Sequence, residues 1–183
     1  MTLCTTKKIE FARDKSRKIE AEFKGGDVTS DGGILLLREV DRKLGLIKKI
    51  AGFIEDPRQQ DKCNHEQTTM LRQRIFGLAL GYEDLNDHST LRKDKAFQVA
   101  VEQQDHLASS STLCRLENRI TTKAMWQISE ALVDVFIQSH KKAPKELILD
   151  FDATNDPVHG DQLGAVFHGY YDQYCFLPLY VFC

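Results

Sequence analysis

The hydrophobic pattern of this chain changes its period at Ala143 and Pro144. Before these residues, apolar side chains recur at three- and four-residue spacings, which is typical of helices that bury one face. After them, the apolar run from Leu147 to Phe151 is short and alternates as in a β-strand. The sequence therefore predicts an α+β protein, in which a helical region is followed by strands.

Five helices are expected before Pro144. The first begins at a cap formed by Ser30 or Asp31 and ends at Gly45. The second spans Glu66 to Leu80 and buries an apolar stripe. The polar residues that this pattern leaves on its other side are Arg72, Gln73 and Arg74.

The third and fourth helices are expected to be short. The third runs through Leu91, Phe97 and Val101 and is capped by Asp87 or Ser89. The fourth is the segment TLCRLENRI, residues 112–120, which follows a run of serines.

The fifth helix begins at Thr121 or Thr122 and is expected to bury one continuous face. Trp126 lies beside that face and is expected in the core. The apolar residues of the face are Met125, Ile128, Leu132, Val135 and Phe136.

Short helices joined by polar turns, the last of them opened by serine, look like a helix-turn-helix arrangement. Its DNA-binding candidates are Arg115, Asn118 and Arg119, with Arg72 and Arg74 as phosphate contacts. The alternative is a helical bundle with no role in DNA binding. Residues 65–120 hold seven basic and eight acidic side chains, so a DNA-binding surface there would have to be a local basic face.

Composition excludes several classes of protein. The 183 residues carry 25 basic and 27 acidic side chains, 42% hydrophobic residues and no apolar run long enough to span a bilayer. No signal peptide is recognisable, so we expect a cytoplasmic protein that does not bind membranes. Five cysteines without CxxC spacing fit reduced thiols, and the isolated pair Cys63 and His65 lacks the partners of a zinc site.

The segment LILDFDAT contains the strongest chemical signal. Period-two alternation places Ile148, Asp150 and Asp152 on one face of the strand. Two carboxylates at the end of a buried strand are costly unless a cation neutralises them, and oxygen ligands suit Mg²⁺ or Mn²⁺. The alternative is that both aspartates cap the following turn, together with Thr154, Asn155 and Asp156.

The string LDFDAT by itself matches two kinds of enzyme. It fits the DxDxT motif of haloacid-dehalogenase-type phosphohydrolases, in which Asp150 would be the nucleophile. It also fits the first strand of RNase H-like nucleases and transposases, in which an Asp followed by x-Thr binds the catalytic metal.

Five motifs in order distinguish between these alternatives. DVTSDGGILLLREVDRKLGL, LRQRIFGLALGYEDLNDHSTLRKD, STLCRLENR, LDFDATNDPVHG and FHGYYDQYCFLPLYVFC together resemble the N-terminal part of bacterial insertion-sequence transposases of the DDE domain group 1 type. The resemblance covers the chain from about Asp27 to Cys183. It implies an N-terminal strand or arm at residues 1–30, a helical DNA-binding region at 31–142 and the first strands of a truncated RNase H-like core at 143–183.

The same resemblance implies the chemistry. Asp152 matches the first acidic residue of the catalytic triad, and Asp150 is a weaker companion as metal ligand. Two Mg²⁺ or Mn²⁺ ions would serve hydrolysis and strand transfer on double-stranded DNA at the element's terminal inverted repeats, with homo-oligomers forming on the DNA.

The sequence contains no match for the second Asp and the Glu of the triad, which lie later in the family. We therefore expect a fragment or decayed copy that is inactive alone, with an unpaired apolar edge on a strand from Cys175 to Cys183. The alternative function is a non-catalytic remnant that only binds DNA.

Overall fold

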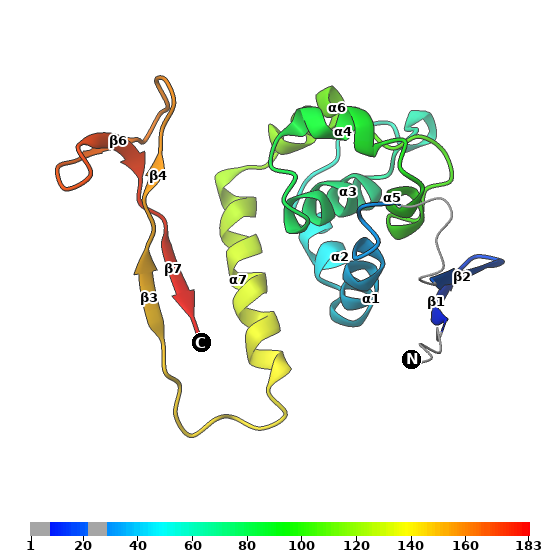
Figure 1. Ribbon diagram of the computed structural model, residues 1–183, viewed down its shortest axis with the longest axis horizontal. Helices are drawn as coiled ribbons and strands as arrows, with labels where there is room; N and C mark the ends of the chain where they lie inside the picture. The colour runs from blue at the N-terminus through cyan, green and yellow to red at the C-terminus, as the bar shows by residue number, and fades with distance from the viewer. Residues whose placement is uncertain (1–7, 22–28) are drawn as a thin grey trace, which may run out of the picture. The chain divides into compact units, whose positions relative to one another are not determined.

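The computed structural model describes residues 8–21 and 29–183 (Figure 1). The chain forms two compact units, of which the first ends at Ser139 and the second runs from His140 to Cys183. The first unit contains a β-hairpin and helices and the second contains only strands and loops, so the α+β prediction is confirmed. Within the described residues, no helix has the length and apolar character needed to cross a membrane.

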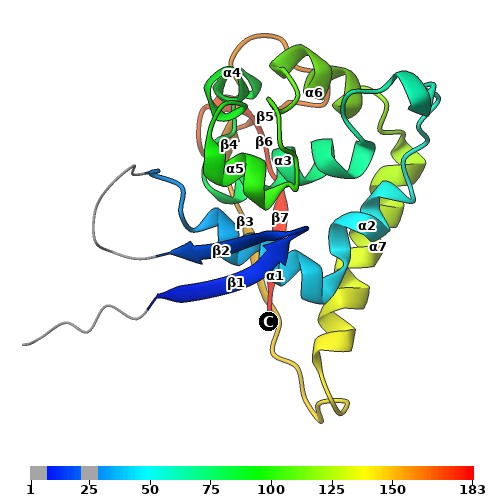
Figure 2. The ribbon, with the colours of Figure 1, turned by 90° about the vertical axis from the view of Figure 1, so that its right-hand side faces the viewer.

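The first unit begins with an antiparallel hairpin of β1 (Ile9–Asp14) and β2 (Arg17–Ala21). Both strands lie within the N-terminal strand or arm expected at residues 1–30, of which residues 1–7 and 22–28 lie outside the described residues. Figure 2 shows the hairpin beside the helix α1.

Helices make up the rest of the first unit. Gly45 has a φ of 64°, which L-residues with side chains rarely adopt, and it ends the first helix as the sequence predicts. The helical elements are α1 (Ile34–Leu44), α2 (Leu46–Ala51), η1 (Gln60–Lys62), α3 (Gln67–Ala79), η2 (Leu85–Asp87), α4 (His88–Leu91), α5 (Lys95–Ala100), α6 (Ser110–Glu117) and α7 (Thr122–Ser139).

The third predicted helix is wrong as a single element. Asp87 and Ser89 belong to a first short segment that ends at Leu91, and a new helix, α5, begins at Lys95. The cause is Asp94, whose carboxylate accepts a hydrogen bond of 3.0 Å from the Phe97 N–H and caps α5.

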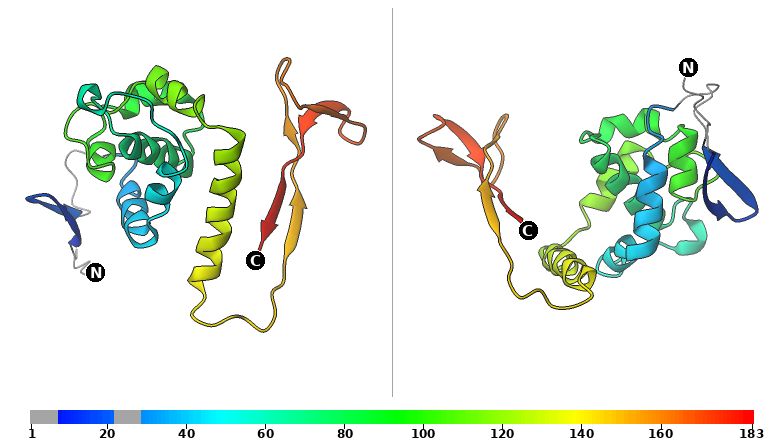
Figure 3. Two further views of the ribbon diagram at one scale, coloured as in Figure 1. Left: turned by 180° about the vertical axis from the view of Figure 1, so that it is seen from behind. Right: turned by 60° about the horizontal axis from the view of Figure 1, so that its bottom comes forward.

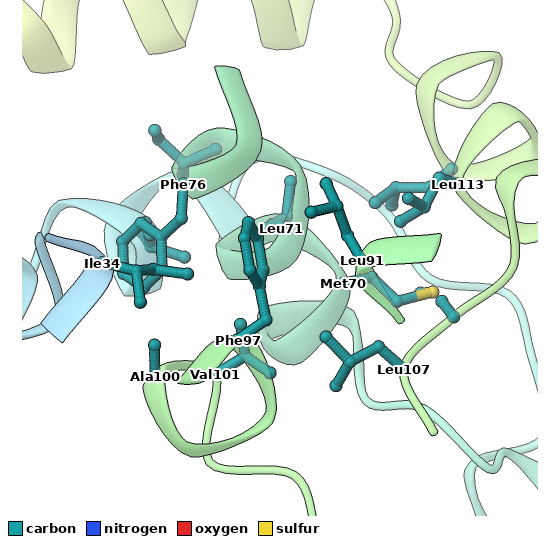
Figure 4. Packing of buried hydrophobic residues seen from close by; sticks show 14 of the residues in the cluster. Ile34, Met70, Leu71, Phe76, Leu91, Phe97, Ala100, Val101, Leu107 and Leu113 are labelled. Carbon is teal, nitrogen blue, oxygen red and sulfur yellow. The ribbon is translucent and has the colours of Figure 1, made fainter. Parts of the chain in front are cut away.

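Apolar side chains from α1 to α7 form one core in the first unit (Figure 4). Ile34, Phe97 and Leu113 are fully buried within it. Gln73 is fully buried as well, so its predicted place on the outer side of α3 is wrong. Its side chain is buried because it bonds to both backbone groups of Ala108, at 3.0 Å each.

The predicted burial of α7 is only partly correct. Thr121 caps the helix through a 3.2 Å bond from the Ala124 N–H, as expected. Ala124 and Ala131 are buried, but Met125 and Trp126 are 58% and 70% exposed, so Trp126 is not a core residue. The reason is that α7 packs mainly on α2, which covers a narrow line along the helix.

The second unit consists of two antiparallel sheets. β3 (Asp150–Ala153) pairs with β7 (Leu179–Phe182), as Figure 3 also shows, while β6 (Gln173–Phe176) lies between β4 (Asp156–Pro157) and β5 (Val166–His168). The strand therefore begins at Asp150 rather than Leu147. The single strand predicted from Cys175 onward is divided, because Pro178 separates β6 from β7 and Pro has no N–H for a ladder.

Candidate functional site

Asp150 and Asp152 lie two positions apart on β3, which puts their side chains on one face with Cα atoms roughly 7 Å apart. Phe182 is directly opposite Asp150 on β7, and Tyr180 is opposite Asp152. Directly opposite residues share a face, so the two stacked rings, with centroids 6.3 Å apart, lie on the same face as the carboxylates, on the β7 side. The prediction that the aspartates share one face of the strand is confirmed, while the aromatic neighbours were not foreseen.

The other face of this two-stranded sheet is entirely apolar. Its residues are Phe151, Ala153, Leu179 and Val181, and all of them are exposed. The expected burial of the strand is therefore wrong for this unit. The physical reason is that residues 140–183 contain no helix that could cover either face of the sheet.

The hydroxyl of Thr154 lies near the second aspartate. Its Oγ1 is 3.5 Å from Asp152 Oδ2, and its backbone N–H donates to the Pro178 carbonyl at 3.2 Å. The backbone bond joins the end of β3 to the start of β7. Thr154 is therefore positioned to restrict the orientation of the Asp152 carboxylate, in agreement with the D-x-T pattern.

Carboxylate oxygens are the ligands that Mg²⁺ and Mn²⁺ prefer, and Mg²⁺ commonly takes only one or two of them from a protein. Asp150 and Asp152 fit that role in number and chemistry. Among the described residues, however, no three His, Cys, Asp or Glu side chains gather as a metal site, the Cys63 and His65 region included. The two aspartates alone fit one weakly held ion rather than a complete two-ion site.

Arg115 and Asn118, two of the predicted DNA-contacting residues, are exposed on the helix α6 and at its C-terminal end. Ser111, Cys114, Arg115 and Asn118 are exposed and form one face, because they are three and four positions apart. Arg115 donates to the neutral Thr112 Oγ1 at 3.1 Å, and no carboxylate of residues 8–21 and 29–183 pairs with it. Asn118 donates to Cys114 Sγ at 3.4 Å.

Arg74 and Arg119 have carboxylate partners inside the first unit. Arg74 Nε is 2.5 Å from Glu117 Oε1, and its other nitrogens donate to the carbonyls of Tyr82 and Glu83. Arg119 Nη1 is 2.6 Å from Asp56 Oδ1. Both side chains join segments distant in sequence, and a DNA contact for either remains a prediction.

Arg72 is also engaged. Its Nε is 3.3 Å from Asp41 Oδ2 and its Nη1 is 3.2 Å from Glu102 Oε2. Arg42 reaches the second oxygen of Glu102 at 2.8 Å. The predicted phosphate contact of Arg72 therefore competes with two internal carboxylates.

These ion pairs shift the pKa values of their carboxylates. The hydrogen bond from Arg58 holds the pKa of Asp56 far below its ordinary value, and Arg119 adds to this effect. Burial acts to raise the pKa of Glu102, but the Arg42 hydrogen bond and the nearby arginine charges outweigh it, so the pKa is lowered. Both carboxylates are therefore ionised near neutral pH and continue to hold their arginines.

A family model described as transposase DDE domain group 1 matches residues 11–183. The chain belongs to this transposase family. The match runs from β1 to the end of β7, so it includes both units, and it confirms the family that the five sequence motifs suggest. No curated protein and no solved structure matches this group 1 transposase chain.

The sequence gives no indication of the carboxylates that pair with the candidate arginines, because these carboxylates are far away along the chain. Asp56 lies 63 positions from Arg119, and Glu117 lies 43 positions from Arg74. Sequence reasoning could identify the arginines but not that each had an internal carboxylate. The exposed face of α6, by contrast, follows from helical spacing alone.

Proposed function

We propose that this chain is the DNA-binding and first catalytic part of a metal-dependent transposase that cuts and joins double-stranded DNA at the element's terminal inverted repeats. The observation that carries the proposal is the pair Asp150 and Asp152 on one exposed face of β3, in a chain of the DDE transposase family. In this proposal β3 and β7 are the first strands of an RNase H-like core.

Asp152 is the proposed principal ligand of Mg²⁺ or Mn²⁺, with Asp150 as its companion. When bound, such ions supply activation of the attacking oxygen and stabilisation of the leaving oxygen in phosphodiester cleavage. Thr154 would orient the Asp152 carboxylate through its hydroxyl. Tyr180 and Phe182 would lie beside the bound ion on the β7 side, on the same face of the sheet as the carboxylates.

The charge of the second unit supports a cation at this site. Residues 146–183 contain six Asp and Glu side chains and no Lys or Arg. A DNA backbone carries one negative charge for about every 1.7 Å of helix axis, so it is repelled by such a surface. Divalent ions held by the aspartates would remove this repulsion at the place where chemistry occurs.

DNA affinity then has to come from the first unit. The exposed face of α6 offers Arg115 as a phosphate or base contact and Asn118 as a base contact. Arg72, Arg74 and Arg119 are proposed as weaker contributors, because internal carboxylates already hold them. Assembly of two or more copies on paired element ends is part of the proposal.

A second candidate function is DNA binding without catalysis. The observation that favours it is the absence, among residues 8–21 and 29–183, of any group of three metal-ligating side chains. A two-ion site requires more carboxylates than Asp150 and Asp152 provide. In this case the chain would occupy element ends without cutting them.

The binding part of the proposal is tested by salt titration of duplex DNA binding. Arg115→Ala should lower the magnitude of the slope of log affinity against log salt by about 0.9, the value of one phosphate contact. Lys48→Ala, which removes an exposed charge from α2, is the matched control and should leave the slope unchanged. An unchanged slope in the Arg115 variant would remove α6 from the DNA interface.

A further inference from the structure

The hairpin of β1 and β2 carries three cations that the ion-pair network leaves uncompensated. Arg13, Lys15 and Arg17 are exposed, and none has a carboxylate within ion-pair distance among the described residues. The other two lysines of the hairpin differ in this respect. Lys8 pairs with Glu20, and Lys18 pairs with Glu10 and Glu20.

The backbone of the hairpin concentrates these three cations at one end. Phe11 pairs with Ile19 and Asp14 with Arg17, so two residues of β1 oppose one residue of β2 between these pairs. This bulge lies next to the turn and bends the ribbon. Arg13 belongs to the bulge, and Lys15 forms the turn with a φ of 52°, in a region where glycine or asparagine is usual.

The same end of the hairpin is fixed to the helical body. Arg38 of α1 is 2% exposed, and its Nη1 donates to the Ala12 carbonyl at 3.1 Å. Asp14 is 6% exposed, so the one acidic residue of the turn faces inward. The cationic end is therefore fixed to the helical body, and its basic side chains are exposed.

A cavity of about 460 Å³ lies behind the turn, but it does not explain the three cations. Lys15, Arg42 and Arg72 line it together with Asp14, Glu66 and Glu102, so its charges balance. An anion inside it would meet as many carboxylates as cations. Lys15 lines this cavity and is also exposed, whereas Arg13 and Arg17 are exposed and do not line it.

We propose that Arg13, Lys15 and Arg17 form a DNA-backbone contact, separate from α6, through which the hairpin binds phosphates of the duplex. This inference rests on the proposed function, which gives the chain duplex DNA as its polyanionic substrate. Binding through this contact should depend on charge and not on the base sequence of the DNA, because Lys and Arg side chains that bind phosphates do not distinguish between bases. Two-stranded ribbons are of a width that fits a DNA groove.

The test is fluorescence anisotropy of a labelled 20-base-pair duplex of arbitrary sequence between 50 and 200 mM salt. The variant Lys15→Ala/Arg17→Ala should lower the magnitude of the log–log salt slope by about 1.8, two contacts at about 0.9 each. The control Lys48→Ala/Lys123→Ala removes the same charge from α2 and α7 and should retain the slope. Far-ultraviolet circular dichroism verifies that each variant is folded.

The outcomes separate this inference from the proposed function. If the unmodified chain shows no salt-dependent binding, both are overturned. If it binds, and the hairpin and control variants have equal slopes, the hairpin contact alone is overturned. If the hairpin variant loses slope while Arg115→Ala does not, the hairpin contact stands and the α6 assignment fails.

Discussion

Replacement of the buried Gln73 by leucine tests how the helix α6 is held. Gln73 Oε1 accepts from the Ala108 N–H and Nε2 donates to the Ala108 carbonyl, both at 3.0 Å. Nε2 also lies 3.3 Å from Nδ1 of the buried His88. Gln73→Leu keeps the volume approximately but leaves both Ala108 backbone groups without these partners.

The cost can be worked from these contacts. An orphaned buried polar group costs about 1–3 kcal/mol, and two of them at Ala108 give roughly 4 kcal/mol. This is a large part of the 5–15 kcal/mol that is typical for a folded domain. Because Ala108 precedes Ser109, the N-cap residue of α6, the exposed face that carries Arg115 should also lose its fixed position.

Urea unfolding followed by circular dichroism measures this loss. The matched control is Gln138→Leu, an exposed position on α7, which should change the unfolding free energy by less than about 0.5 kcal/mol. A loss below about 1 kcal/mol in the Gln73 variant would refute the reasoning, since water or a rearranged backbone would then satisfy Ala108.

Two further predictions concern the same part of the core. In Gly77→Ala the new Cβ would lie 2.9 Å from His88 Cε1, so we expect a loss of about 1–3 kcal/mol in urea unfolding, whereas Gly33→Ala, which meets open space, should be near neutral. Burial lowers the pKa of His88 from 6.5, and the charge of Arg74 adds to this, so the neutral ring is favoured in the folded state. Its stabilising contribution is complete above about pH 6.5 and is lost as the pH falls from there through the folded-state pKa. The free energy of unfolding should therefore be lower at pH 5.5 than at pH 7.5. An equal or higher value at pH 5.5 would contradict the prediction.

Helices with local signals were predictable from the sequence. The end of α1 at Gly45 and the serine-opened start of α6 depend on residues at or next to the boundary. The break between α4 and α5 was missed although Asp94 is also a local cap. Several Asp and Ser residues in that segment can cap, and which one does so depends on packing around Phe97.

Burial that depends on a distant partner was not predictable. Gln73 reads as a polar residue of an outer face, but its partner Ala108 is 35 positions away. For Trp126 the error is the opposite, because a large apolar residue beside a stripe is exposed when the helix packs mainly on α2.

In the candidate site, too, local features were predictable from the sequence and features that depend on distant residues were not. Period-two alternation was sufficient to place Asp150 and Asp152 on one face. The identity of the opposite residues Tyr180 and Phe182 required the register of β7, which is separated from β3 by a loop and three other strands.

The central claim is that Asp152 holds a divalent metal ion. It is tested most directly by adding Mn²⁺ to the ¹⁵N-labelled chain and recording amide resonances by nuclear magnetic resonance, because Mn²⁺ broadens signals close to its binding site. The account predicts selective broadening at residues 150–154 and at Tyr180 in the unmodified chain and its loss in Asp152→Ala. Uniform broadening, or broadening at these residues that persists in the Asp152 variant, would contradict the assignment of Asp152 as the metal ligand.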